Sequence, residues 1–234
     1  MLYRTIDPVR VIETARLLEA RIADRFPDSG LRKVARELIA LGEDIAQGAA
    51  ALEAPVRWLR VLTAVTVLIG LLIIAFVMTI LSFDRISTGV FDFVQGIEAA
   101  LNTILIAGLG MLTLTQTEVR LKRRKVFAGL HSLRSMIHVI DMHQLTKDPA
   151  ALSADFEPSE HSPRRTLTAA ELLRYLDYCS EMLSITGKLA ALYAQSVNDE
   201  VVVQAVNDVE NLGTNLSRKI WQKITMIGDV GTRG

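Results

Sequence analysis

The chain has 234 residues, and its 26 Lys and Arg balance its 26 Asp and Glu, so the formal net charge is zero. Its single cysteine, Cys179, excludes an intrachain disulfide and suits a reducing compartment. Half of the residues are hydrophobic. Because a soluble domain can share that average, the distribution of apolar residues along the chain has to decide the class of protein.

Residues 1–56 predict two N-terminal helices. Asp7 can cap the first, with Pro8 at the first helical position, and this helix is expected to run to about Phe26. A second helix is expected shortly after it, before a break or kink at Pro55, because proline removes a backbone donor. Its apolar positions step by three and four in a coiled-coil-like stripe: Leu31, Val34, Leu38, Leu41, Ile45, Gly48 and Leu52.

Residues 57–118 predict a transmembrane hairpin. No charged side chain lies between Val61 and Phe83, nor between Ala99 and Thr117. A helix of about 20 such residues matches the roughly 30 Å hydrocarbon core of a bilayer. We therefore expect spans at about 59–82 and 97–117, joined by a short outer connector. A signal peptide fits poorly, because helical sequence precedes the first span and no A-x-A-like site follows it directly.

The flanking charges predict the orientation of the hairpin. Arg57 and Arg60 precede the first span, whereas the connector holds one cation, Arg85, against Asp84 and Asp92. Five cations follow the second span: Arg120, Lys122, Arg123, Arg124 and Lys125. Since positive residues are retained on the cytoplasmic side, we expect a multi-pass protein of the plasma (inner) membrane with both termini in the cytoplasm.

The rest of the chain predicts cytoplasmic helices, which makes the protein all-α. Residues 119–145 extend the second span without a proline, on an apolar stripe through Val126, Leu130, Leu133, Ile137 and Ile140. Residues 146–166 hold three prolines and no periodicity, as expected of a linker. In residues 167–234, Thr168 and Glu171 form a capping box before two closely connected helices, which should pair antiparallel.

A polar stripe runs along the predicted second span. Its members advance by three or four residues: Glu98, Asn102, Leu105, Leu109, Thr113 and Gln116. Carboxylate and amide groups facing lipid are unfavourable, so this stripe should face protein or water. The same helix has a small face at Thr103, Ala107 and Gly110, and the first span has one at Thr63, Thr66 and Gly70. Small residues favour helix packing, and one neighbouring helix does not cover both faces of the second span, so we expect a homo-oligomer.

Two hypotheses for the function follow from the stripe. In the first, the stripe lines a homo-oligomeric pore or ion-conducting module, with Glu98 and Asp92 as acidic rings at the outer mouth that favour cations. A cytoplasmic helical bundle would assemble or gate it. In the second, the stripe only joins helices, and the chain is a membrane-anchored scaffold or sensor that recruits a cytoplasmic protein partner.

The basic run of residues 120–125 is a candidate site for lipid headgroups, at Arg120, Lys122, Arg123, Arg124 and Lys125. The alternative is that the run only fixes topology, and both interpretations are compatible. Nucleic-acid binding is not expected, because the run adjoins the predicted membrane face, lacks interleaved aromatic residues, and precedes a net acidic segment.

Three histidines, His131, His138 and His143, fall in the predicted extension of the second span. His138 and Asp141 lie one turn apart and are weak candidates for a metal site, but the i, i+4 spacing of strong helical sites is missing. Polar contacts or pH sensing are the alternatives. No P-loop, G-x-G-x-x-G or G-x-S-x-G motif occurs. We therefore expect neither a cofactor nor an enzyme.

Overall fold

The computed structural model describes residues 5–54, 56–80, 90–152, 156–157, 159–162 and 167–231. All regular secondary structure among these residues is helical, so the protein is all-α. The elements are α1 (Pro8–Arg25), α2 (Gly30–Glu53), α3 (Arg57–Ile80), α4 (Val90–Leu145), the short 3₁₀ helix η2 (Pro149–Leu152), α5 (Ala169–Ser196) and α6 (Glu200–Gly231). The predicted break at Pro55 and most of the outer connector lie outside the described residues.

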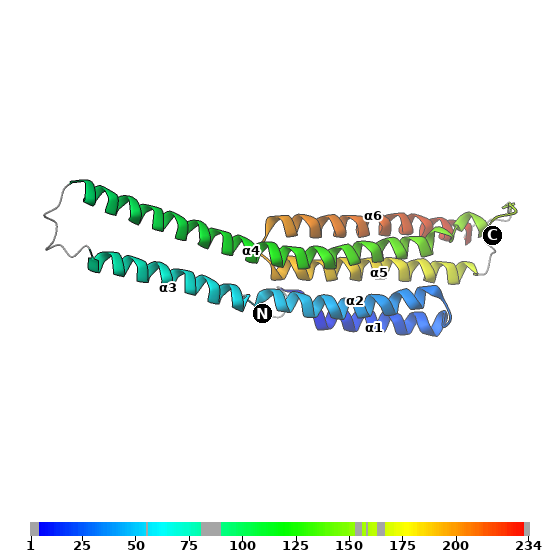
Figure 1. Ribbon diagram of the computed structural model, residues 1–234. Coiled ribbons are helices and arrows are strands. Elements are labelled where there is room, and N and C mark those ends of the chain that lie inside the picture. Colours follow the sequence, from blue (N-terminus) through cyan, green and yellow to red (C-terminus); the bar gives the residue numbers. More distant parts are fainter. Residues whose placement is uncertain are drawn as a thin grey trace. The chain divides into compact units, whose positions relative to one another are not determined.

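The chain divides into two compact units. The first joins residues 1–53 to residues 125–234, and the second comprises residues 54–124. In the first unit, α1, α2, α5, α6 and the last part of α4 run lengthwise beside one another as a helical bundle (Figure 1). Segments that are far apart in the sequence, at the two ends of the chain and in its middle, thus share one core.

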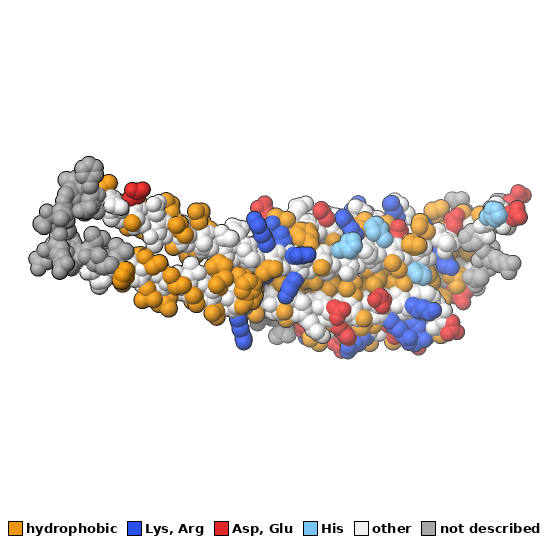
Figure 2. Space-filling view, in the orientation of Figure 1, with side chains coloured by type: hydrophobic (Ala, Val, Ile, Leu, Met, Phe, Trp, Pro, Cys, Tyr) orange, Lys and Arg blue, Asp and Glu red, His pale blue; other side chains and the backbone are white. Residues whose placement is uncertain are grey.

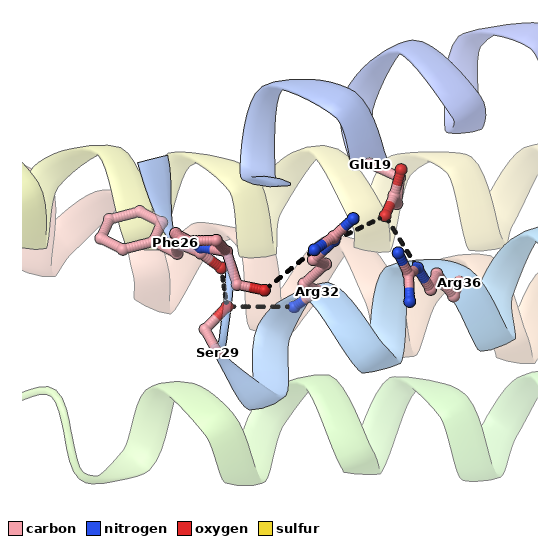
Figure 3. Close-up of polar contacts among 6 residues, drawn as sticks. Glu19, Phe26, Ser29, Arg32 and Arg36 are labelled. Atoms are coloured by element: carbon pink, nitrogen blue, oxygen red, sulfur yellow. Dashed lines mark hydrogen bonds and ion pairs between the residues drawn. The ribbon is translucent and has the colours of Figure 1, made fainter. Parts of the chain in front are cut away.

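Polar contacts fix the turn between α1 and α2 (Figure 3). The Ser29 hydroxyl donates to the Phe26 carbonyl at 2.8 Å and accepts the Arg32 backbone N–H at 3.2 Å, which caps the start of α2. Arg32 and Arg36 both donate to one carboxylate oxygen of Glu19, each at 2.9 Å. These guanidinium groups, Arg32 foremost, hold the pKa of Glu19 below its ordinary value. The turn is therefore specified by local side chains.

The caps of α1 and α5 are those that the sequence predicts. The Asp7 carboxylate accepts the Val9 N–H at 2.9 Å, with Pro8 as the first residue of α1. The Thr168 hydroxyl accepts the Glu171 N–H at 3.3 Å, and the Glu171 carboxylate accepts the Thr168 N–H at 2.8 Å. Both halves of the capping box are thus present, and they satisfy donors that the helix itself leaves unpaired.

The helices α5 and α6 pair antiparallel, as expected from their short connection. The Ser180 and Ser217 hydroxyl oxygens lie 2.6 Å apart. One turn later in α5, a Cβ on Gly213 would lie 3.5 Å from the Leu183 carbonyl. The α6 partner therefore moves back along the sequence as the α5 partner moves forward, which is the register of an antiparallel pair.

The core of the bundle is continuous from α1 to α6. The predicted stripe of α4 is buried at every position from Val126 to Ile140. Fully buried side chains come from all five helices of this unit and include Leu18, Ile22, Leu31, Leu38, Ile45, Leu133, Ile137, Leu176, Met182 and Leu189. Burying a side chain of this size contributes about 1.5–3 kcal/mol. The bundle therefore has a core large enough to stabilise it.

The predicted linker is partly packed on the bundle. Its residues Pro149–Leu152 form η2, and Pro149 is buried. The Lys147 ammonium lies 5.2 Å from the centre of the Tyr175 ring of α5, which places a cation over an aromatic face. The beginning of the segment is thus held by side-chain contacts that its composition did not indicate.

Candidate functional site

The helices α3 and α4 each carry an apolar stretch long enough to cross a membrane. Only 6% of the most apolar window of the first stretch, and none of that of the second, is buried inside the chain. A soluble core helix of this hydropathy would be mostly covered by its own chain. Contacts within the chain therefore leave the apolar surface of the described parts of α3 and α4 uncovered.

Apart from Leu59, which is 2% exposed at the start of α3, the half-buried positions of the hairpin include its small residues. Thr63, Thr66 and Gly70 of α3 are half-buried, and so are Thr103, Ala107 and Gly110 of α4. These are the two small faces predicted from the sequence. A Cβ on Gly70 or Gly110 would nevertheless meet no atom within 4 Å. The small faces are thus shielded without close helix packing at these two glycines.

The predicted polar stripe lies on exposed surface of α4. All of its described members are exposed: Glu98, Asn102, Leu105, Leu109, Thr113 and Gln116. Leu105 and Leu109, at the middle of the stripe, are 61% and 63% exposed. Asp92 belongs to α4, but its side chain lies outside the described residues. The stripe and the shielded small face therefore lie on different sides of α4.

The hydroxyl groups of this region are satisfied within their own helices. Thr66 donates to the Leu62 carbonyl at 2.9 Å, and Thr113 donates to the Leu109 carbonyl at 2.8 Å. Such bonds reduce the unfavourable energy of placing threonine in an apolar environment. The side chains of Glu98, Asn102 and Gln116, in contrast, form no hydrogen bond with any described residue. The unmet polarity of the stripe is concentrated in these three groups.

A carboxylate ties α3 to α4 at one end of the hairpin. One oxygen of Glu118 accepts the Val56 backbone N–H at 3.3 Å and lies 3.3 Å from the Lys122 ammonium. Val56 directly precedes α3, where backbone donors lack helical partners. Glu118 therefore caps α3 from the neighbouring helix. This role was not predicted from the sequence, although Glu118 is the only acidic residue between Glu98 and Asp141.

The candidate lipid-headgroup residues gather near this contact. Arg120, Arg124 and Lys125 are exposed, Lys122 and Arg123 are half-buried, and Arg57 and Arg60 of α3 are exposed as well. Figure 2 shows blue basic side chains where the orange apolar surface of α3 and α4 ends. Trp58 is exposed beside them, and its ring is of the amphipathic kind found at membrane interfaces.

The weak metal candidates, His138 and Asp141, differ in their surroundings. His138 is exposed, and Asp141 is half-buried and accepts the side-chain amide of Gln144 at 2.6 Å. No group of three His, Cys, Asp or Glu side chains within the described parts of the chain has metal-binding geometry. The distribution of histidines therefore gives no support to a metal centre there.

His143 is the histidine that enters the bundle. Its Nδ1 lies 3.4 Å from the Tyr175 hydroxyl, and its ring lies against Gly30 at the start of α2. Burial, with a further contribution from Lys147, lowers the pKa of His143. Nothing in the sequence around His143 identified Tyr175 or Gly30, because both are far away along the chain.

The neighbouring buried groups are structural. The Lys223 ammonium donates to the Gln144 side-chain oxygen at 2.6 Å and to its backbone carbonyl at 3.1 Å, and burial lowers the pKa of Lys223. Burial also raises the pKa of the Cys179 thiol to about 12, despite the nearby Lys223. A thiol of this kind is a poor nucleophile. The Cys179 thiol is therefore not activated, and the Lys223 contacts join α6 to Gln144 of α4.

No protein family, curated protein or solved structure matches this chain. No relative therefore assigns a role to any of these residues.

Proposed function

We propose that the chain forms a homo-oligomeric membrane pore or ion-conducting module that its helical bundle assembles or gates. The observation that carries the proposal is the exposed polar stripe of α4, which lies within an apolar surface that the chain itself does not cover. In a helix that faces only lipid, the carboxylate of Glu98 and the amides of Asn102 and Gln116 would be unfavourable.

Insertion of α3 and α4 as a transmembrane hairpin explains their exposed apolar side chains. The basic residues at the Glu118 end favour the cytoplasm for that end. The hairpin would then lie in the inner membrane. The bundle and both termini would be in the cytoplasm, and the connector of residues 81–89 would be on the outer side. The exposed Trp58 supports a membrane–water interface at the same end of the hairpin.

Self-association explains the stripe. Ionisable side chains within membrane segments nearly always face protein or water. Copies of α4 arranged around an axis would turn Glu98, Asn102 and Gln116 away from lipid. Repetition of Glu98 around that axis would create an acidic ring, which favours cations.

Conductance of the reconstituted full chain tests this proposal. We expect cation-selective currents in planar bilayers, and Glu98→Gln should lower the preference for cations because it removes the charge of the ring. Glu37→Gln is the matched control, since Glu37 is exposed on α2 in the bundle. Inserted protein that passes no current under varied pH, divalent ions and voltage would refute the pore.

A second candidate is a membrane-anchored scaffold or sensor that recruits a cytoplasmic protein. It is favoured by a surface cavity of about 330 Å³ between α5 and α6, bordered by the exposed Trp221. If the chain is such a scaffold or sensor, the double variant Asn102→Leu, Gln116→Leu should still recruit the cytoplasmic protein. If the pore proposal is right, the same variant should abolish conductance while the chain still inserts.

A further inference from the structure

The contact between Glu118 and Val56 sets the register of the basic residues of the two helices. Arg57 follows Val56 directly and Arg60 lies one turn further along α3, while Arg120 and Arg124 follow Glu118 along α4. At 1.5 Å per residue, all four lie within about 10 Å of that contact along their helices. Two groups that are 60 residues apart in sequence therefore form one basic zone.

This zone has little internal compensation. No ion pair with a described residue is formed by Arg57, Arg60, Arg120 or Arg124. The carboxylate of Glu118 is already engaged by Lys122 and by the Val56 N–H. The four arginines repel one another, and the sequence holds no acidic residue from 54 to 83 or from 119 to 140.

We propose that this zone binds the phosphate headgroups of anionic phospholipids. The inference rests on the proposed insertion of the hairpin, because the basic zone begins where the exposed apolar surface of α3 and α4 ends (Figure 2). A ligand that fits both features carries a negative phosphate next to acyl chains. Arginine suits this ligand, since its planar guanidinium donates two parallel hydrogen bonds to phosphate oxygens.

The alternative is that the same cations only determine the topology of the hairpin and do not bind one class of lipid in preference to another. Each basic residue close to an anionic surface contributes roughly a fivefold gain in affinity. Loss of all four arginines should therefore weaken binding of anionic lipid on the order of several hundredfold. A topology determinant alone predicts no change in the lipid preference of protein that is already inserted.

The test uses the purified full chain in detergent, with phosphatidylglycerol or phosphatidylcholine added and retained lipid counted by native mass spectrometry. The wild type should retain phosphatidylglycerol preferentially, and added salt should weaken that preference by screening. The variant R57Q/R60Q/R120Q/R124Q should lose it. The control neutralises four exposed bundle cations, K33Q/R134Q/R218Q/K219Q, and should keep it.

Two further arms separate the possible outcomes. The variant R57K/R60K/R120K/R124K conserves the charge and should retain most of the preference for phosphatidylglycerol. If it also loses that preference, substitution at these positions disturbs the fold, and the loss in the glutamine variant is not due to charge. Competition by inorganic phosphate at millimolar concentration, without any preference for phosphatidylglycerol, would assign the zone to a soluble phosphate and overturn the lipid proposal. Equal retention of both lipids by the wild type would also overturn it.

Failure of the proposed function gives a different result. A chain that does not float with phosphatidylcholine vesicles does not insert, which refutes the membrane hairpin itself. A chain that floats but shows no preference for phosphatidylglycerol refutes only the headgroup site. Neither the flotation measurement nor the lipid-retention measurement requires the chain to conduct ions.

Discussion

Replacing Gly129 with alanine probes the contact that docks α4 on α5. A Cβ on Gly129 would lie 2.0 Å from the Tyr193 hydroxyl oxygen and 2.7 and 2.8 Å from two carbons of its ring. Favourable carbon contacts begin at about 3.5 Å. Tyr193 is only 5% exposed, so its ring has no open space into which to move without displacing core neighbours.

The expected effect is a net loss of stability. Overpacking a core costs about 1–3 kcal/mol, whereas exchanging glycine for alanine inside a helix returns up to about 1 kcal/mol. Gly129→Ala should therefore destabilise the bundle by about 1–2 kcal/mol. For a domain of this size that lowers Tm by roughly 2–8 °C.

Thermal unfolding followed by circular dichroism measures this effect. Gly187→Ala is the matched control, because its Cβ would lie 3.8 Å from Glu210 Cγ, an ordinary contact; its Tm should stay level or rise. In the double variant Gly129→Ala, Tyr193→Ala, the first substitution should no longer destabilise, since the ring is gone. If Gly129→Ala alone behaves like the control, α4 does not pack on α5 as described.

Three further predictions concern the bundle. Thr168→Ala removes the cap of α5 and should cost about 0.5–2 kcal/mol, measured by denaturant unfolding. The pKa of His143 is lowered in the folded state, so the unfolded chain binds more protons and stability should fall as the pH drops below about 6.5; His143→Gln should flatten this dependence in melts between pH 5 and 7.5. Cys179, buried and with a raised pKa, should resist maleimide until the bundle unfolds.

The local features of the fold were predictable from the sequence. The caps at Asp7 and Thr168 and the end of α4 at Leu145 follow from residue types whose effect is confined to one turn of helix. The buried stripe of α4 followed from its period, because residues three and four apart share one face. Predictions of this kind need only neighbours in the chain.

Contacts between distant segments were not predictable. Periodicity does not specify which elements become neighbours, and three features depend on that: the contact of Glu118 with the start of α3, the contact of His143 with Gly30, and the burial of Pro149. At the predicted linker, composition did not indicate that Pro149–Leu152 form η2 or that Pro149 is buried. The exposure of the polar stripe likewise required coordinates, since a periodic polar face is also typical of a helix interface.

The two parts of α4 have different surfaces, and this difference bears on the proposed function. Up to the basic run, large apolar side chains are exposed on several sides of the helix, with Leu101 at 56% and Ile106 at 72%. From Val126 onward, one face is buried and the opposite face carries polar residues such as His131 and Arg134. All-round apolarity suits hydrocarbon, whereas a one-sided stripe suits water. The exposed polar stripe and the buried stripe belong to one helix, because α4 runs from Val90 to Leu145. A simple anchor needs neither the stripe nor this continuity, so α4 is the element through which the bundle would assemble or gate the proposed pore.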